Sequence, residues 1–294
     1  MVARSTLLAA TLCAALLTLH GCAAPPRFTN SEQARLSALL PADVLLLGEQ
    51  HDAPEHQHLQ RNTVQWLAAQ GQLAAVAMEM AERGRSTAGL PASASQSDVR
   101  AALAWHDAGW PWSTYGPVVM AAVRAGVPVL GANLPMARLR DAMGDAGLDA
   151  RLPPDALRTQ QRRIREGHCH ALPETQIAPM TRVQIARDVA MADTVRAAAQ
   201  AGRTVLLVAG NGHVQRDLGV PLHLPREFKA KVVMAQADPA PIATQSIAID
   251  TRSDPRAADL LWPTPPTPAR DYCADFKPKP RPASTKPSAP SAPR

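Results

Sequence analysis

The stretch VLLLGEQH at residues 44–51 decides the fold, because four branched apolar residues run directly into a glycine and then into polar side chains. A run this short and this continuously apolar is typical of a parallel β-strand that is buried on both faces. A second stretch, VLLVAGNGH at residues 205–213, has the same order of apolar run, glycine and histidine. Two such stretches in one chain predict a parallel sheet.

Short apolar runs alternate along the chain with longer segments of helical periodicity. The apolar runs lie at 43–48, 74–80, 127–132, 204–209 and 231–235. The helical segments lie at 55–70, 115–125, 136–146, 155–166 and 181–201. This alternation predicts a single α/β domain with an open, mostly parallel sheet that helices cover on both faces. The segment 83–96 is rich in small and polar residues, which predicts a loop or a mobile flap.

The first 21 residues have the pattern of a bacterial lipoprotein signal peptide. One positive charge, Arg4, precedes an apolar run at 7–19 that is too short to span a bilayer. The run ends in LHGC, so Cys22 is the expected site of lipid attachment, and an ordinary signal peptide cleaved after Ala23 or Ala24 is the alternative. We therefore expect an outer-membrane lipoprotein of a bacterial cell envelope, held by its lipid and facing the periplasm or the surface.

The other end of the chain differs in composition from the middle. From Pro263 onward it is rich in Pro, Ala, Ser, Thr and Lys, which predicts disorder. We therefore expect a signal peptide at 1–21, an anchor and linker at 22–40, the α/β domain at 41–276 and a disordered Pro/Ser/Lys-rich tail at 277–294. Arg4 and five basic residues of the tail account for the formal charge of +6, so the domain itself is nearly neutral and no nucleic-acid partner is expected.

Two cysteines remain after those of the signal peptide and the lipid attachment site. Cys169 and Cys273 form an even pair in a compartment expected to be oxidising, which predicts one disulfide. The bond would hold residues 271–276 on the domain. Two free or buried thiols are the alternative.

Polar side chains stand where the predicted strands end. They are Glu49, His51, Glu79, Asn133 and His213. Because the carboxyl ends of parallel strands meet at one edge of a sheet, we expect these five side chains to converge. Two imidazoles and two carboxylates can hold a divalent metal or orient a water molecule. One interpretation is therefore a metal-dependent hydrolase with Glu49, His51, Glu79 and His213 as its catalytic residues.

Aromatic residues gather in one short segment of a chain that is otherwise poor in them. They are Trp105, Trp110, Trp112 and Tyr115. A hydrophobic cluster packed under a loop is one interpretation. The other is a wall for a flat apolar ligand, with Tyr115 offering a phenolate to a ferric iron.

Several blocks of the sequence together resemble the ChaN family of haem-binding lipoproteins. The blocks are DVLLLGEQHD at 43–52, AMEM at 77–80, WSTYGP at 112–117, GAN at 131–133, QIARDVAMA at 184–192 and GNGHV at 210–214. They occur in the order of the family and span roughly residues 40–275. The resemblance implies an α/β domain that binds haem and acts in haem or iron uptake or handling at the cell envelope.

The resemblance also implies roles for individual residues. Tyr115 is the candidate axial ligand of the haem iron, because a tyrosinate suits ferric iron. The other residues of the candidate haem site are Trp110, Trp112, His51, His213 and Asn133. A large flat ligand on a small protein implies a haem-dependent homodimer. The wider superfamily includes TIKI-type hydrolases built on the same two Gly-x-x-His segments, so the hydrolase stays open as the alternative, although the aromatic segment favours a binding protein over an enzyme.

Overall fold

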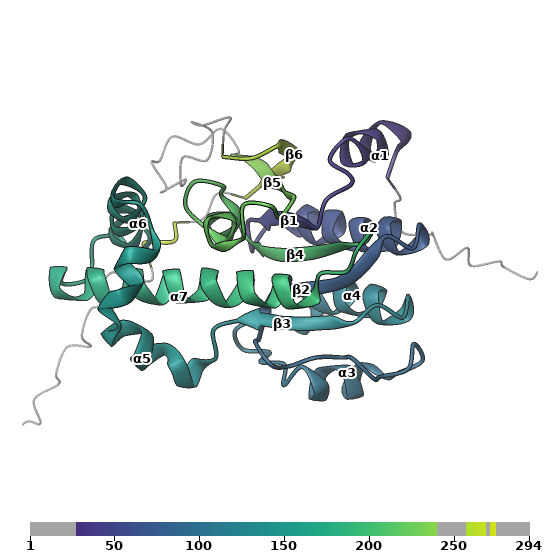
Figure 1. Cartoon of the computed structure of the whole chain (residues 1–294), viewed down its shortest axis with the longest axis horizontal. Helices are drawn as coiled ribbons and strands as arrows, with labels where there is room; N and C mark the ends of the chain where they lie inside the picture. The colour runs from purple at the N-terminus through teal and green to yellow at the C-terminus, as the bar shows by residue number, and fades with distance from the viewer. Residues whose placement is uncertain (1–27, 240–256, 269–270, 275–294) are drawn as a thin grey trace, which may run out of the picture.

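The computed structural model describes residues 28–239, 257–268 and 271–274 (Figure 1). Its strands form one six-stranded sheet in the order β3-β2-β4-β1-β5-β6, and every neighbouring pair is parallel. In chain order the strands are β1 (Val44–Glu49), β2 (Leu73–Glu82), β3 (Val129–Asn133), β4 (Thr204–Gly210), β5 (Ala230–Pro239) and β6 (Leu260–Thr267). This arrangement confirms the predicted open parallel α/β sheet.

Strand β1 shows how the sheet is buried on both faces. Leu45 and Leu47 belong to the core beneath helices α2 (Pro54–Ala69) and α4 (Trp112–Arg124). Val44 and Leu46 point to the opposite face and pack in the core beneath α7 (Glu174–Ala198). Figure 1 shows α7 running along one face of the sheet and α2 and α4 on the other. Each of these four side chains is fully buried, and burying one contributes about 1.5–3 kcal/mol.

Shorter elements complete the two helical layers. The remaining helices are α1 (Asn30–Ser37), α3 (Gln96–Ala102), α5 (Leu139–Gly144), α6 (Pro154–Gly167) and α8 (Asn211–Val214), with 3-10 turns at Met136–Arg138, Ala146–Arg151 and Val220–His223. All five predicted helical segments contain helix. Helix α7 begins at Glu174 instead of residue 181, and Pro179 lies inside it. A proline removes a backbone donor from a helix and argues against one, which is why the sequence predicted this helix only from residue 181.

The ordered domain begins before residue 41, within the segment expected to be a linker. Leu36 of α1 is fully buried. The rings of Phe28 and Trp262 lie 5.7 Å apart, and the Arg35 guanidinium lies 4.6 Å from the centre of the same Trp262 ring. Helix α1 is therefore part of the domain and packs beside its last strand.

The disorder predicted from Pro263 onward is wrong for the first residues of that segment. Strand β6 runs through Pro263, Pro265 and Pro266. Among the described strands it is the outermost, beside β5, and a proline whose nitrogen faces the open side of such a strand removes no ladder hydrogen bond. The buried Trp262 side chain joins the core and helps to hold the strand in place.

The segment 83–96 is a loop for most of its length, as predicted, but its first part is attached to β3. The Arg85 carbonyl accepts a hydrogen bond from the Gly131 amide at 2.8 Å, and the Thr87 amide donates to Val129 at 2.9 Å. The loop thereby covers the free edge of β3. A Cβ on Gly131 would lie 2.0 Å from the Glu82 carbonyl oxygen, so only glycine allows this close approach.

Cys169 and Cys273 form the predicted disulfide. The bond joins residues 104 positions apart and links the turn between α6 and α7 to the segment that follows β6. The predicted signal peptide, Cys22 and the tail at 277–294 lie outside the described residues. Among the helices of the described ranges, none combines the length and the apolar character needed to cross a membrane.

Replacing Cys169 and Cys273 together by serine is expected to lower the free energy of unfolding by about 2–4 kcal/mol, because the bond closes a long loop in the unfolded chain. Urea unfolding of the oxidised proteins, followed by circular dichroism, measures the change. Reductant should bring the wild type to the stability of the double variant and leave the variant unaffected. Equal stability of the oxidised and reduced wild type would contradict a stabilising bond.

Candidate functional site

Glu49 is the centre of a buried hydrogen-bond network at the carboxyl end of β1. One carboxylate oxygen accepts hydrogen bonds from the Tyr115 hydroxyl and from Nδ1 of His51, each at 2.6 Å. The other oxygen accepts from the side-chain amides of Gln57, at 2.7 Å, and Gln60. The two glutamines are three residues apart on one face of α2. Four donors therefore compensate a carboxylate whose side chain is fully buried.

The Tyr115 phenol is held in its protonated form. Helix α4 carries it into the core, where it is 1% exposed and donates its hydrogen bond to Glu49. Burial and the Glu49 carboxylate raise the pKa of Tyr115 well above its ordinary value of 10. Coordination of a metal by this oxygen therefore requires the hydroxyl to give up its proton and its bond to Glu49.

His51 connects this network to the protein surface. Its side chain is 44% exposed, and its ring meets the edge of Trp110 with the ring centres 4.9 Å apart. Burial acts to lower the pKa of His51, but the hydrogen bond to Glu49 and the charge of Glu79 raise it above 6.5. A Cβ on Gly210 would lie 2.9 Å from Nε2 of His51, so the imidazole depends on a glycine at the end of β4.

Glu79, His213 and Asp188 form a second cluster, on the face of the sheet that α7 covers. Nδ1 of His213 lies 2.5 Å from an Asp188 carboxylate oxygen, and Nε2 lies 3.5 Å from a Glu79 oxygen. The other Glu79 oxygen accepts the backbone N–H of Gly210 at 2.7 Å. All three side chains are almost completely buried, so the cluster is an ion network within the interior.

The two carboxylates hold His213 in its protonated form. Burial acts to lower the pKa of His213, but the attraction of Glu79 and Asp188 on opposite ring nitrogens raises it to about 10. Burial also disfavours the charged form of Glu79, yet the attraction of His213 and His51 lowers the pKa of Glu79 below its ordinary range. For Asp188, burial is the larger effect and raises the pKa to about 6. At neutral pH the second cluster therefore contains an imidazolium between acidic groups.

The two clusters meet at Gly210. His51 Nε2 and a Glu79 oxygen lie 2.9 Å and 3.6 Å from the point where a Cβ of Gly210 would stand. Glu49, His51, Glu79 and His213 are thus brought together at one rim. Asn133 ends the outer strand β3, and within the described residues its side chain makes no hydrogen bond to the other four.

Sequence reasoning missed the residues that complete both clusters. They are Gln57, Gln60, Gln184 and Asp188. Gln184 lies 3.1 Å from the His213 ring and is four residues before Asp188, so both face the same side of α7. This spacing was the one available signal, because which residues of a helix meet a strand end depends on how the helix packs.

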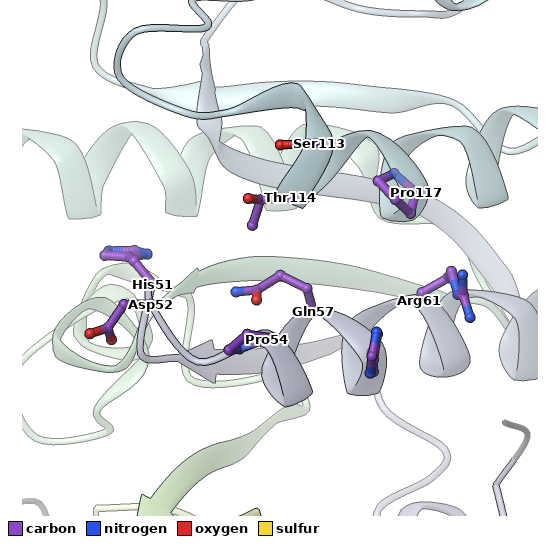
Figure 2. A pocket seen from close by; sticks show the side chains of 9 residues that line it. His51, Asp52, Pro54, Gln57, Arg61, Ser113, Thr114 and Pro117 are labelled. Carbon is purple, nitrogen blue, oxygen red and sulfur yellow. The ribbon is translucent and has the colours of Figure 1, made fainter. Parts of the chain in front are cut away.

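An open pocket of about 290 Å³ lies beside His51, between α2 and α4 (Figure 2). The side chains that line it belong to His51, Asp52, Pro54, Gln57, His58, Arg61, Ser113, Thr114 and Pro117. Tyr115 is not on its surface, because this side chain turns inward to Glu49. The pocket therefore offers a mixed apolar and polar surface with the His51 imidazole at one end.

The tryptophans form mostly a packed cluster. Trp105 and Trp112 meet edge to face with the ring centres 5.0 Å apart, and Trp112 is 9% exposed. Their indole N–H groups donate to the Trp110 carbonyl and to Gln96. Among the three, Trp110 contacts both His51 and Tyr115, at 4.9 Å and 5.7 Å between ring centres. Trp110 is therefore the aromatic residue at the edge of the site.

The divalent-metal alternative requires a set of ligands that point to one position. In the part of the chain that the structure describes, no group of three or more His, Cys, Asp and Glu side chains has a geometry that could hold a metal ion. The carboxylates and imidazoles of the rim are instead hydrogen-bonded to one another.

The chain matches the family model described as haem-binding uptake, Tiki superfamily, ChaN, over residues 35–224, which is more than half of its length. A solved structure of ChaN from Campylobacter jejuni, described as cofacial haem binding, has a TM-score of 0.60 and 24% identity; the alignment covers 78% of this chain and 90% of that one. This similarity shows that the two share a fold.

Two other solved structures are more distant. The type III effector HopBA1 gives a TM-score of 0.44 and 14% identity over 83% of this chain and 97% of its own. A Bacillus cereus protein gives a TM-score of 0.38 and 12% identity over 71% and 70% of the two chains. Similarities this weak carry no conclusion about function. No curated protein matches the chain.

The substitution Glu49→Gln is expected to lower the free energy of unfolding by about 2–3 kcal/mol, because the new amide would turn its own donors toward groups that donate to the carboxylate. Glu82→Gln is the matched control, since Glu82 accepts one hydrogen bond, from the Met136 amide. Urea unfolding of both variants measures the difference. Similar losses in the two proteins would show that the four donors to Glu49 contribute little.

The raised pKa of His213 predicts a pH dependence of stability. A group whose pKa is higher in the folded state stabilises the fold fully below its ordinary value of 6.5, and this contribution is lost as the pH rises through about 10. We therefore expect the melting temperature to fall between pH 6.5 and 10, and the His213 imidazole to titrate near the top of that window in NMR spectra. Asp188→Asn should lower that pKa; titration of His213 near pH 6.5 in the wild type would contradict the network.

Proposed function

We propose that this protein, which belongs to the ChaN family of haem-binding uptake proteins in the Tiki superfamily, binds haem at the rim of its sheet, in the pocket between α2 and α4. One observation carries the proposal: the half-exposed imidazole of His51, which is hydrogen-bonded to the Glu49 carboxylate, lies at an open pocket. Imidazole and phenolate are both established ligand types for haem iron.

The pocket is lined by two prolines and by polar side chains, which suits a flat molecule with an apolar face and polar groups at its edge. Pro54 and Pro117 supply apolar walls, and Trp110 packs against the His51 ring that faces the pocket. The volume of about 290 Å³ lies at the lower limit of the roughly 300–1,000 Å³ that is usual for small-molecule sites. A porphyrin would therefore extend beyond the pocket, and a second copy of the chain that covers its outer face would complete a haem-dependent homodimer.

Tyr115 is the proposed ligand of the haem iron; because its hydroxyl faces Glu49 and not the pocket, the side chain would have to turn away from Glu49 to reach a haem bound there. A bound haem would supply a ferric iron, for which a tyrosinate is a suitable partner. The raised pKa of Tyr115 opposes loss of the phenol proton. Glu49 accepts the hydrogen bond of this hydroxyl and is the base in position to take the proton. His51 donates to the same carboxylate oxygen and is half exposed, so it links the Glu49 network to solvent.

His213 has a structural role in this proposal. Its two ring nitrogens face Asp188 and Glu79, and its side chain is 7% exposed, so it offers no free nitrogen to a ligand in the pocket. The ion network that it forms with these two residues fixes Gly210, whose N–H is bonded to Glu79. Because Gly210 has no side chain, the His51 imidazole can occupy the space beside it.

The proposed location is the bacterial cell envelope, with Cys22 as the lipid attachment site of an outer-membrane lipoprotein that takes up or handles haem. The LHGC pattern that ends the apolar run at 7–19 supports it. The bond between Cys169 and Cys273 supports it independently, because disulfides persist in oxidising compartments.

A haemin titration of the whole chain in detergent, followed in the Soret region, tests the proposed function. The wild type should show a saturable shift, and Tyr115→Phe should change its position and weaken binding at least about tenfold, the equivalent of about 1.4 kcal/mol. Tyr272→Phe is the comparison, because this second tyrosine is 47% exposed and donates to Asp52 of the pocket wall; a changed Soret position in this variant and not in Tyr115→Phe would move the ligand to Tyr272.

The other outcomes are equally informative. No saturable shift in a wild-type protein that is folded by circular dichroism would overturn haem binding. An identical shift in the wild type and Tyr115→Phe would retain haem and remove Tyr115 as its ligand. His51→Gln would then be the next variant to titrate.

A further inference from the structure

One face of helix α2 forms a wall of the pocket. Its residues Pro54, Gln57, His58 and Arg61 follow the spacing i, i+3, i+4 and i+7, which places them in a row along the helix. Figure 2 shows His51 and Arg61 toward opposite ends of this wall, with Gln57 between them. The proposed position of the iron is therefore near His51, at one end of the wall, and the Arg61 guanidinium lies at the other end.

Several arginines of the domain are paired with an acidic side chain, and in the part of the chain that the structure describes Arg61 is not. Arg83, Arg100 and Arg182, for example, each pair with an aspartate at 2.8–3.1 Å. Within the described residues, the Arg61 side chain forms no ion pair, and its Nε is buried without a hydrogen-bond acceptor. A ligand in the pocket would meet the Arg61 side chain at atoms other than this buried Nε, and no acidic side chain pairs with them among the described residues.

The acidic side chains closest in sequence to this wall are already engaged elsewhere. Asp52, which also lines the pocket, accepts a hydrogen bond from the Tyr272 hydroxyl. Glu55 lies 3.4 Å from the His58 ring. Neither pairs with Arg61 in the described part of the chain, so the guanidinium is available to an anion that enters the pocket.

We propose that Arg61 binds a carboxylate of the ligand and thereby sets the direction in which the ligand enters the pocket. This inference rests on the proposed function: the carboxylate is a propionate of haem, and the iron lies toward His51. A guanidinium presents two parallel N–H donors that match the two oxygens of a carboxylate, and the charge strengthens both hydrogen bonds. Arg61 is therefore a specificity-determining residue that favours a porphyrin with free carboxylates over one without them.

The test compares haemin with haemin dimethyl ester, in which both propionates are esterified, on the whole chain in the same detergent. Wild-type protein should bind haemin at least about tenfold more tightly than the ester, as expected for a charge-assisted hydrogen bond. Arg61→Gln should weaken haemin binding by about the same factor and leave ester binding unchanged. Arg61→Lys should restore part of the preference, because it returns the charge without the paired donors.

Arg140→Gln is the matched control, since Arg140 is exposed on α5, away from the pocket, and its replacement changes the net charge equally. It should behave as the wild type with both ligands. An unchanged preference in Arg61→Gln, or an equal loss for haemin and its ester, would overturn the role of Arg61 while leaving haem binding intact. Failure of the wild type to bind either compound would overturn the proposed function itself, and the role of Arg61 with it.

Discussion

The rim of the sheet is organised by the need to stabilise one buried negative charge, the carboxylate of Glu49. An ion at the end of an apolar strand is unfavourable unless donors surround it, and here the donors come from three separate parts of the chain. Gln57 and Gln60 fix the rotation of α2 about its axis, and Tyr115 fixes α4. The pocket lies between these two helices. Its shape therefore depends on a hydrogen-bond network of which only His51 and Gln57 reach the pocket surface.

The alternation of side chains along parallel strands divides the rim into two chemically different halves. Glu49 faces the α2 and α4 side, where its partners are amides, a phenol and an imidazole at the surface. Glu79 faces α7, where its partner is a buried imidazolium that is shared with Asp188. The first half reaches solvent at His51. The second half is closed and holds the backbone at Gly210 in place.

The central fold could be predicted from the sequence because each buried parallel strand is a short apolar run that ends in glycine or a polar residue. Convergence of Glu49, His51, Glu79 and His213 followed from the same rule, and the disulfide followed from the count of cysteines. Strand β6 was missed because prolines argue against a strand unless its place at a sheet edge is known. Asp188, Gln57 and Gln60 were missed because their roles depend on how helices rotate against the sheet. That Tyr115 turns inward to Glu49 likewise follows from packing and not from its position in the aromatic segment.

The bond between Cys169 and Cys273 also changes how the chain is connected. It closes residues 169–273 into a covalent ring that contains α7 and strands β4, β5 and β6. The edge strand β6 is consequently attached to the domain from both of its ends. A single cut of the backbone between β5 and β6 would open the ring without releasing β6, and the two fragments would separate only under reducing conditions. The ring thus keeps the edge strand attached beside β5 after such a cut.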